Sequence, residues 1–318
     1  IDSISISENN ISLKSSINVV VEKKPYSYQY SKKGRDTVET NYVLDNVFKT
    51  LRFDIKRYNK RNTLFIDPEL IFSTYTGAMG DNWGFTATYD NEGNVYSAGI
   101  LYNWNGMEYP VNVGAFQTKN FGGVSEVGII KYDPTGTKKL YATYLGGSNS
   151  EMPHSMVVNS KNELIVYGTT ASPDFPLANS SANNSTFKGG QSITYDNIGF
   201  TDGVDIFVSK ISPDGSNLQS STFLGGTSND GLNFDSSIPD SQLETGTGRL
   251  YYNYGDGARG EVIVDKNDNV YIGTCTYSTD IPITGGFQQV NAGGKEGYVV
   301  KLNPNFGNCL ELVSWRKF

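Results

Sequence analysis

Three short sequence phrases recur in the same order along the chain, and this internal repeat constrains the fold more than any other feature. The opening phrase is rich in hydroxyl and aromatic residues and ends in glycine; its copies start 69 and 79 residues apart, at 72–77, 141–147 and 220–226. The middle phrase sets Asp, Asn or Gly before apolar residues, at 90–96, 159–165 and 265–271. The closing phrase runs from an apolar stretch into proline, at 128–134, 206–213 and 299–304. Such self-similarity marks a fold built from repeated supersecondary units.

Each repeat unit reads as four short strands. Asp, Asn and Gly in the middle phrase supply the side-chain hydrogen bonds and the positive φ angles that a tight turn between two strands requires. The proline of the closing phrase cannot donate to a sheet ladder, so it ends the strand that precedes it. Four strands with this punctuation are typical of a propeller blade.

The sequence therefore predicts an all-β chain, a partial β-propeller of three four-stranded blades preceded by a small β-sandwich-like domain. The predicted boundaries are 1–70 for the N-terminal domain, which we expect to be incomplete, 71–139, 140–218 and 219–308 for the blades, and 309–318 for the start of a further strand or a truncated tail. Even small propellers need four blades, so three would leave sheet edges uncovered. We expect the rest of a longer protein, or a partner chain, to complete the ring.

The composition agrees with this prediction and excludes two classes of partner. Of the 318 residues, 13% are aromatic and 35 are glycine, which suits many short strands joined by tight turns. The net charge of −7 leaves no basic surface for nucleic acid, and no stretch of 18 apolar residues is present to span a membrane. The two cysteines form no CxxC pair, so neither a zinc site nor a disulfide framework is predicted.

The repeated phrases resemble a family of bacterial β-propeller repeats that read approximately "STYLGG", "D-x-x-GN-x-Y", "TDFP" and "FV-x-KL-x-P-x-G". Such repeats are abundant in large cell-surface and secreted proteins of the Bacteroidota, many of which resemble gliding-motility-associated proteins exported by type IX secretion. Residues 1–70, which end in Ile66-Asp67-Pro68-Glu69-Leu70, resemble the latter part of the β-rich domain that precedes those repeats. The resemblance implies a ring of about seven blades and a location outside the cell or on its outer surface. It implies no activity, because the phrases are strand and turn chemistry.

Insertions distinguish the copies and place candidate binding residues in loops. The third copy gains residues 227–259, in which Asp230, Asp235 and Asp240 could hold Ca²⁺, a hard cation that prefers oxygen ligands. Calcium is the only cofactor that the sequence suggests. A Gly-rich phrase further along could orient Asp256 or Arg259 toward a ligand. The same phrase could instead be a turn held by an Arg–carboxylate pair.

Aromatic residues of the first copy are candidate platforms for stacking on sugar rings. Trp83, Trp104 and Tyr109 lie in or beside its long connections. Trp83 could equally pack between blades, whereas Trp104 stands among turn-forming residues that favour exposure. These three residues form the basis of a carbohydrate-binding hypothesis.

The residue inventory points away from catalysis. His154 is the only histidine, which excludes metal sites that need two imidazoles and leaves one position for a Ser-His-Asp relay. The expected function is a non-enzymatic scaffold or adhesin that contacts protein or glycan at the cell surface. Two alternatives stay open: a subunit that docks on a secretion or motility complex, and a propeller-based polysaccharide hydrolase or lyase, which would need two converging carboxylates.

Overall fold

A computed structural model describes residues 2–14, 19–45, 50–67, 72–103, 108–180, 185–195, 198–232, 260–306 and 309–312. All regular secondary structure in these residues is β, which confirms the predicted all-β class. The chain divides into two compact units, Ile1–Ser73 and Thr74–Phe318, and each is described by itself. No described residues form a helix of the length and apolarity that crossing a membrane requires.

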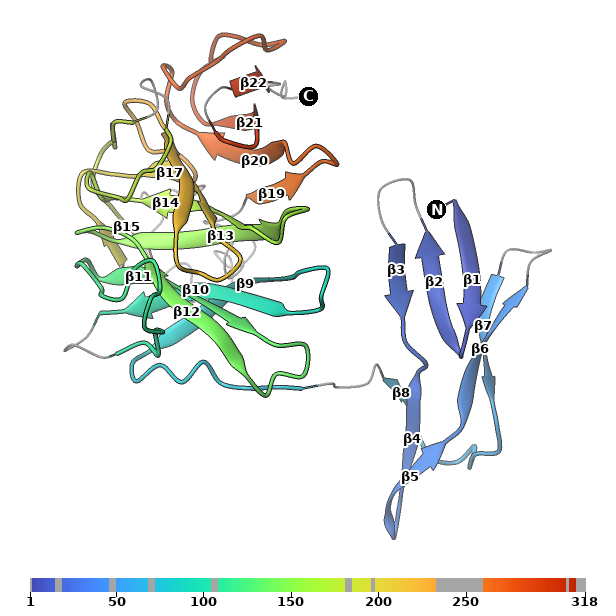
Figure 1. The fold of residues 1–318 in the computed structure, drawn as a ribbon. Coiled ribbons are helices and arrows are strands. Elements are labelled where there is room, and N and C mark those ends of the chain that lie inside the picture. Colours follow the sequence, from blue (N-terminus) through green and yellow to red (C-terminus); the bar gives the residue numbers. More distant parts are fainter. Residues whose placement is uncertain are drawn as a thin grey trace. The chain divides into compact units, whose positions relative to one another are not determined.

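Unit 1 contains three small antiparallel sheets (Figure 1). The first joins β1 (Ser3–Ser7), β2 (Asn10–Lys14) and β3 (Val19–Glu22), the second joins β4 (Tyr26–Ser31) to β5 (Gly34–Val38) and β8 (Leu64–Asp67), and the third joins β6 (Thr40–Asp45) and β7 (Thr50–Ile55). Period-two alternation predicts most of these strands.

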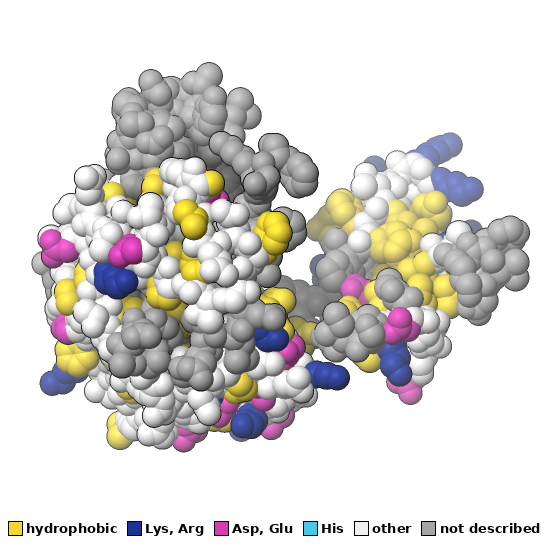
Figure 2. Space-filling view, turned by 90° about the horizontal axis from the view of Figure 1, so that it is seen from above, with side chains coloured by type: hydrophobic (Ala, Val, Ile, Leu, Met, Phe, Trp, Pro, Cys, Tyr) yellow, Lys and Arg dark blue, Asp and Glu magenta, His cyan; other side chains and the backbone are white. Residues whose placement is uncertain are grey.

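Few side chains of unit 1 are fully buried. Ile11 and Val38 are its buried hydrophobic residues among those described, whereas Tyr28 and Phe65 stack with ring centroids 5.0 Å apart. Hydrophobic side chains gather on the face of the smaller body that Figure 2 shows. The exposed large hydrophobic residues of this unit are Val19, Val20, Val21, Tyr30, Leu51 and Phe53.

Unit 2 contains three four-stranded antiparallel sheets, in each of which the strands follow one another in sequence order (Figure 1). The first sheet comprises β9 (Asn82–Tyr89), β10 (Val95–Tyr102), β11 (Ser125–Tyr132) and β12 (Lys139–Leu145); the second comprises β13 (Glu151–Val158), β14 (Leu164–Thr170), β17 (Asp205–Ile211) and β18 (Leu218–Leu224); the third comprises β19 (Glu261–Val264), β20 (Val270–Thr276), β21 (Glu296–Leu302) and β22 (Cys309–Leu312). A small hairpin, β15 (Ile193–Tyr195) and β16 (Ile198–Phe200), lies in the connection between β14 and β17.

The middle phrase of each repeat forms the turn between the first and second strands of a sheet. In the first sheet, Asp90 Oδ1 accepts hydrogen bonds from the backbone amides of Glu92 and Asn94, and the Tyr96 hydroxyl donates to Asp90 Oδ2. Asp265 accepts the equivalent bonds in the third sheet. Since these carboxylates are satisfied by their own turn, the predicted strand, turn and strand are confirmed here.

The sheets are offset by one strand from the repeat of the sequence. The second opening phrase lies in β12, which pairs with β11 of the first sheet, and the third lies in β18, which pairs with β17 of the second sheet. The hairpin turn after each closing phrase returns the chain alongside the strand that it has just left, so the opening phrase completes the sheet before it. The predicted repeat boundaries at 139 and 218 therefore fall at the start of outer strands.

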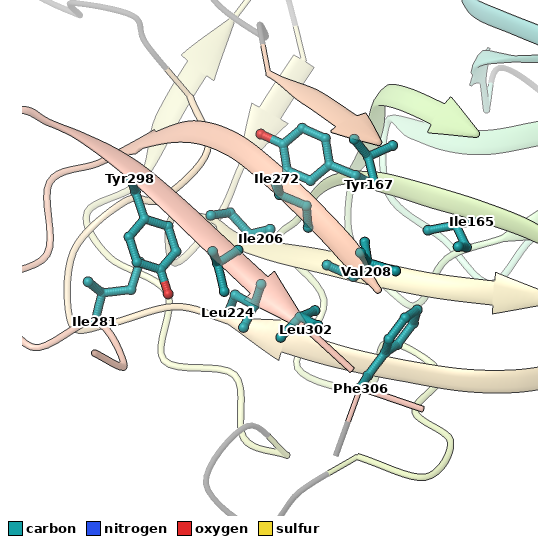
Figure 3. Packing of buried hydrophobic residues seen from close by; sticks show 13 residues of the cluster. Ile165, Tyr167, Ile206, Val208, Leu224, Ile272, Ile281, Tyr298, Leu302 and Phe306 are labelled. Atoms are coloured by element: carbon teal, nitrogen blue, oxygen red, sulfur yellow. The ribbon is translucent and has the colours of Figure 1, made fainter. Parts of the chain in front are cut away.

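Consecutive sheets of unit 2 pack face to face through continuous hydrophobic clusters. β13 contacts β9 on one side and β19 on the other, so the first strands of the three sheets are neighbours. Figure 3 shows the cluster between the second and third sheets, in which Ile206 and Val208 lie near Ile272 and Leu302. A second cluster joins Tyr96 and other residues of the first sheet to Phe207 and other residues of the second. This arrangement is compatible with the packing of blades in a propeller. The described sheets do not form a closed ring.

Candidate functional site

Five of the residues that the sequence suggests as ligand-binding lie outside the described residues: Trp104, Asp235, Asp240, Asp256 and Arg259. The remaining three, Trp83, Tyr109 and Asp230, are described. The structure does not bring these three together, because the two aromatic residues belong to the first sheet and its connections, whereas Asp230 lies between the second and third sheets.

Both aromatic candidates pack against neighbouring tyrosines. Tyr109 is only 5% exposed, its ring centroid lies 5.7 Å from that of Tyr144, and its backbone amide donates to the Tyr144 hydroxyl. Trp83 is half-buried, packs edge-on against Tyr102 at 5.6 Å and borders a hydrophobic cluster. The burial of Tyr109 leaves no ring face for a sugar, and the packing of Trp83 matches the alternative stated for it above.

The oxygens of Asp230 are occupied by protein donors. Its side chain is fully buried and accepts hydrogen bonds from the Gly226 amide at 2.8 Å, the Ser278 hydroxyl at 2.9 Å and the Thr276 hydroxyl. These bonds fix the connection that leads from the second sheet to the third. Asp230 thus has a structural role that the sequence does not reveal.

The only histidine is also part of the packed interior. His154 is 8% exposed, and its ring nitrogens lie 3.2 Å from the hydroxyl oxygens of Tyr167 and Thr169. Burial lowers the pKa of His154 to about 3, so the imidazole is neutral at physiological pH.

An open pocket of about 450 Å³ lies at the first junction, which we define as the region where residues 146–150 lead from the first sheet to the second. The lining residues are Phe116, Gln117, Thr118, Lys119, Phe121, Gly146, Asp174 and Pro176. Phe121 is 63% exposed, whereas Phe116 packs against the cluster between the two sheets. The pocket therefore combines an accessible aromatic ring with side chains that can donate and accept hydrogen bonds.

Two buried carboxyl groups lie beside Gly146 at this junction. Glu126 belongs to β11 and Glu151 begins β13, and both are fully buried. A methyl group built on Gly146 would lie 1.9 Å from Glu126 Oε1 and 2.3 Å from Glu151 Oε2, so these oxygens are no further apart than the sum of the two, 4.2 Å. Glycine is required here because any side chain would enter the space of the carboxyl groups.

Burial raises the pKa of both carboxyls. For Glu126, burial is the main cause and the charge of Glu151 is the second; for Glu151, burial is partly offset by the hydroxyls of Ser172 and Thr170. Asp174, at the rim of the pocket, raises both pKa values further. Glu126 also accepts from Gln117 Nε2 at 3.3 Å and from the Phe121 amide at 3.4 Å, so the buried pair is bonded directly to two pocket residues.

The same arrangement recurs at the second junction, where the chain passes from the second sheet to the third. Asp205 of β17 and Asp230 take the places of Glu126 and Glu151, and Asp280 takes the place of Asp174. Burial raises the pKa of Asp205 to about 7 and that of Asp230 to about 6. Two junctions built alike show that the carboxyl pair belongs to the repeat.

A repeated phrase that the sequence analysis missed carries part of this site. Phe116-Gln117 and Gly122-Gly123 recur with the same spacing as Phe287-Gln288 and Gly293-Gly294. In both copies the glutamine Nε2 donates to the backbone oxygen two residues later. The spacing could have been found in the sequence, whereas the approach of Glu126 to Glu151 could not, because it joins two sheets.

Comparison with protein-family models gives one match, which lies within unit 1. Residues 1–69 match the model of a family described as a domain of unknown function, DUF7948. No match to the chain is found among curated proteins. Among the described residues, no three His, Cys, Asp or Glu side chains converge in a way that could hold a metal ion.

Proposed function

We propose that this chain is a non-enzymatic binding module, the scaffold or adhesive part of a β-propeller protein displayed outside the cell, and that the pocket of the first junction binds carbohydrate. The observation that carries the proposal is the lining of that pocket. Sugars are recognised by aromatic rings that stack on their C–H faces together with polar groups that bond to their hydroxyls. Phe121 supplies the exposed ring, and Lys119 and Asp174 supply a donor and an acceptor.

The packing of unit 2 supports the propeller part of this proposal. Each four-stranded sheet is taken as a blade, with β9, β13 and β19 as the inner strands. Phe116 is packed between two sheets, whereas its counterpart Phe287, in the connection between β20 and β21, is 81% exposed. We infer that a further sheet, from the same protein or from a partner chain, covers Phe287 in the complete assembly.

Glycoside hydrolysis, the alternative activity, fits the described carboxyl groups less well. Hydrolases place two carboxyl groups about 5 to 10 Å apart on either side of an open cleft. Glu126 and Glu151 are closer than this and fully buried, and neither lines the pocket. Their geometry suits a structural role below the pocket.

The test is binding of the whole chain to a panel of soluble polysaccharides and oligosaccharides, measured by calorimetry and by retardation in polysaccharide-containing gels. We expect Phe121→Ala to abolish the binding that the unmodified protein shows. Phe287→Ala is the matched control, since it removes an exposed phenylalanine from the connection between β20 and β21. Equal binding by the two variants, or no binding to any saccharide, would refute the proposed site, and release of reducing ends would favour the hydrolase.

A further inference from the structure

The carboxyl pair of the first junction has an oxygen with no hydrogen-bond partner. Glu151 Oε1 accepts from the hydroxyls of Thr170 at 2.7 Å and Ser172 at 2.5 Å, whereas the fully buried Glu151 Oε2 has no partner. The neighbouring Gly147 amide lies beside this carboxyl without reaching hydrogen-bonding geometry to Oε2. An unpaired buried carboxylate oxygen destabilises the folded state, and a bound ligand would remove this cost.

Glu126, the other carboxyl of the pair, forms only long hydrogen bonds with protein donors. Its two contacts with protein donors measure 3.3 and 3.4 Å, at the long end of the hydrogen-bond range. None of the ion pairs among the described residues includes Glu126 or Glu151. Two adjacent buried carboxyls therefore lack a protein cation that would compensate their charge.

The second junction shows how the same position is satisfied by protein groups alone. Asp205 accepts from the amides of Lys188 at 2.6 Å and Gly189 at 3.1 Å, and both oxygens of Asp230 accept hydrogen bonds. The ammonium of Lys188 also lowers the pKa of Asp205. Lys188 follows Phe187 at the second junction, whereas Gln117 follows Phe116 at the first. The first junction therefore lacks a positive charge at this position.

We propose that Glu126 and Glu151 bind a single Ca²⁺ ion between Glu126 Oε1 and Glu151 Oε2 at the first junction. Calcium–oxygen distances are about 2.3 to 2.6 Å, so one ion can bridge oxygens up to about 5 Å apart, and the limit of 4.2 Å fits. Carboxylate ligands with neutral oxygens and water are the set that a hard cation prefers. Gly146 and Asp174 line the open pocket, which gives the ion a route from solvent.

Ca²⁺ binding at this site can be tested without carbohydrate, because Glu126 and Glu151 are buried and do not line the pocket. The bound ion joins a strand of the first sheet to the first strand of the second. It therefore stabilises the junction that shapes the pocket, and the pocket residues Gln117 and Phe121, which bond to Glu126, gain order from it.

The test is calorimetric titration of the whole chelator-treated chain with CaCl₂ at neutral pH, with terbium luminescence as a second readout. We expect one ion per chain with a dissociation constant of about 0.1 to 1 mM, as in extracellular modules, and a thermal midpoint that rises with Ca²⁺. Glu126→Gln and Glu151→Gln, which keep the shape of the side chain, should each weaken this binding by about 100-fold or more. Asp230→Asn at the second junction is the control and should bind Ca²⁺ as the unmodified chain does.

A second variant keeps the inference testable if the glutamine variants fold poorly. Gln117→Lys introduces the ammonium that the second junction already has, so it should abolish Ca²⁺ binding while the chain remains folded by circular dichroism. Absence of binding to the unmodified chain would mean that the pair takes up a proton only. Undiminished binding by Glu126→Gln, Glu151→Gln or Gln117→Lys would place the ion elsewhere. Each of these results would overturn the proposal.

Discussion

Replacement of Asp205 by asparagine should change how the stability of unit 2 depends on pH. Asp205 is fully buried, and burial is the main cause that raises its pKa from 3.8 to about 7. The charge of Asp230 adds to this, whereas the amides of Lys188 and Gly189 and the Lys188 ammonium oppose it. The folded protein therefore retains a proton on Asp205 over a range of pH in which the unfolded chain has lost it.

The sign and size of the effect follow from proton linkage. A carboxyl with a raised pKa stabilises the folded state fully below the unfolded pKa of 3.8, and that contribution is lost as the pH rises through about 7. Between about pH 4.5 and 6.5 the folded state holds about one more proton than the unfolded state, so the free energy of unfolding falls by about 1.4 kcal/mol per pH unit from this group. Asparagine has no carboxyl group to take up a proton, so Asp205→Asn removes this contribution to the slope.

The assay is urea unfolding followed by tryptophan fluorescence at several pH values in that window. All three tryptophans, Trp83, Trp104 and Trp315, belong to unit 2, so the signal is confined to it. Asp265→Asn is the matched control. The side-chain hydrogen bond from Asn269 is the main cause that lowers the pKa of Asp265 to about 2, so this carboxyl is ionised in both states throughout the window.

The comparison of slopes isolates Asp205 from the other acidic residues. We expect Asp265→Asn to lower the stability by a similar amount at each pH and to keep the slope of the unmodified chain. We expect Asp205→Asn to shift the slope upward by about 1.4 kcal/mol per pH unit. Identical slopes for Asp205→Asn and the unmodified chain would refute the reasoning, because they would show that the buried carboxyl does not hold its proton.

Two further predictions concern packing and thiol reactivity. Gly168→Ala should destabilise unit 2 by about 1 to 3 kcal/mol, because its methyl group would lie 2.2 Å from the Met152 backbone oxygen. The control Gly273→Ala meets no atom within 4 Å and should change the midpoint of urea unfolding little. Equal midpoints for the two variants would contradict the packing around Gly168. Cys275 is half-buried, and desolvation raises the pKa of its thiol to about 11. In a Cys309→Ser background the folded chain should therefore react with Ellman's reagent more slowly than the chain in urea, and equal rates would contradict this prediction.

Local chemistry made the strands and turns of this protein readable from its sequence. The alternation at residues 26–30 predicts β4, and the Asp-x-x-Gly-Asn phrase at residue 90 predicts the turn between β9 and β10. Residues 34–38, which form β5 (GRDTV), show no such alternation, because charged residues interrupt it. These are properties of short segments, so a single sequence contains them.

Pairing and burial between distant segments were decided only by the tertiary structure. A repeat of four strands has no intrinsic starting point, so the phrases could not show that the opening phrase completes the preceding sheet. Tyr109 stands in a polar connection and suggests exposure, yet it packs under Tyr144. Glu126 and Glu151 meet because two sheets pack together beside Gly146, and such a contact depends on the direction of each strand. The sequence by itself determined the repeated unit and its strand chemistry, and packing between sheets determined which carboxyl groups converge and which rings stay accessible.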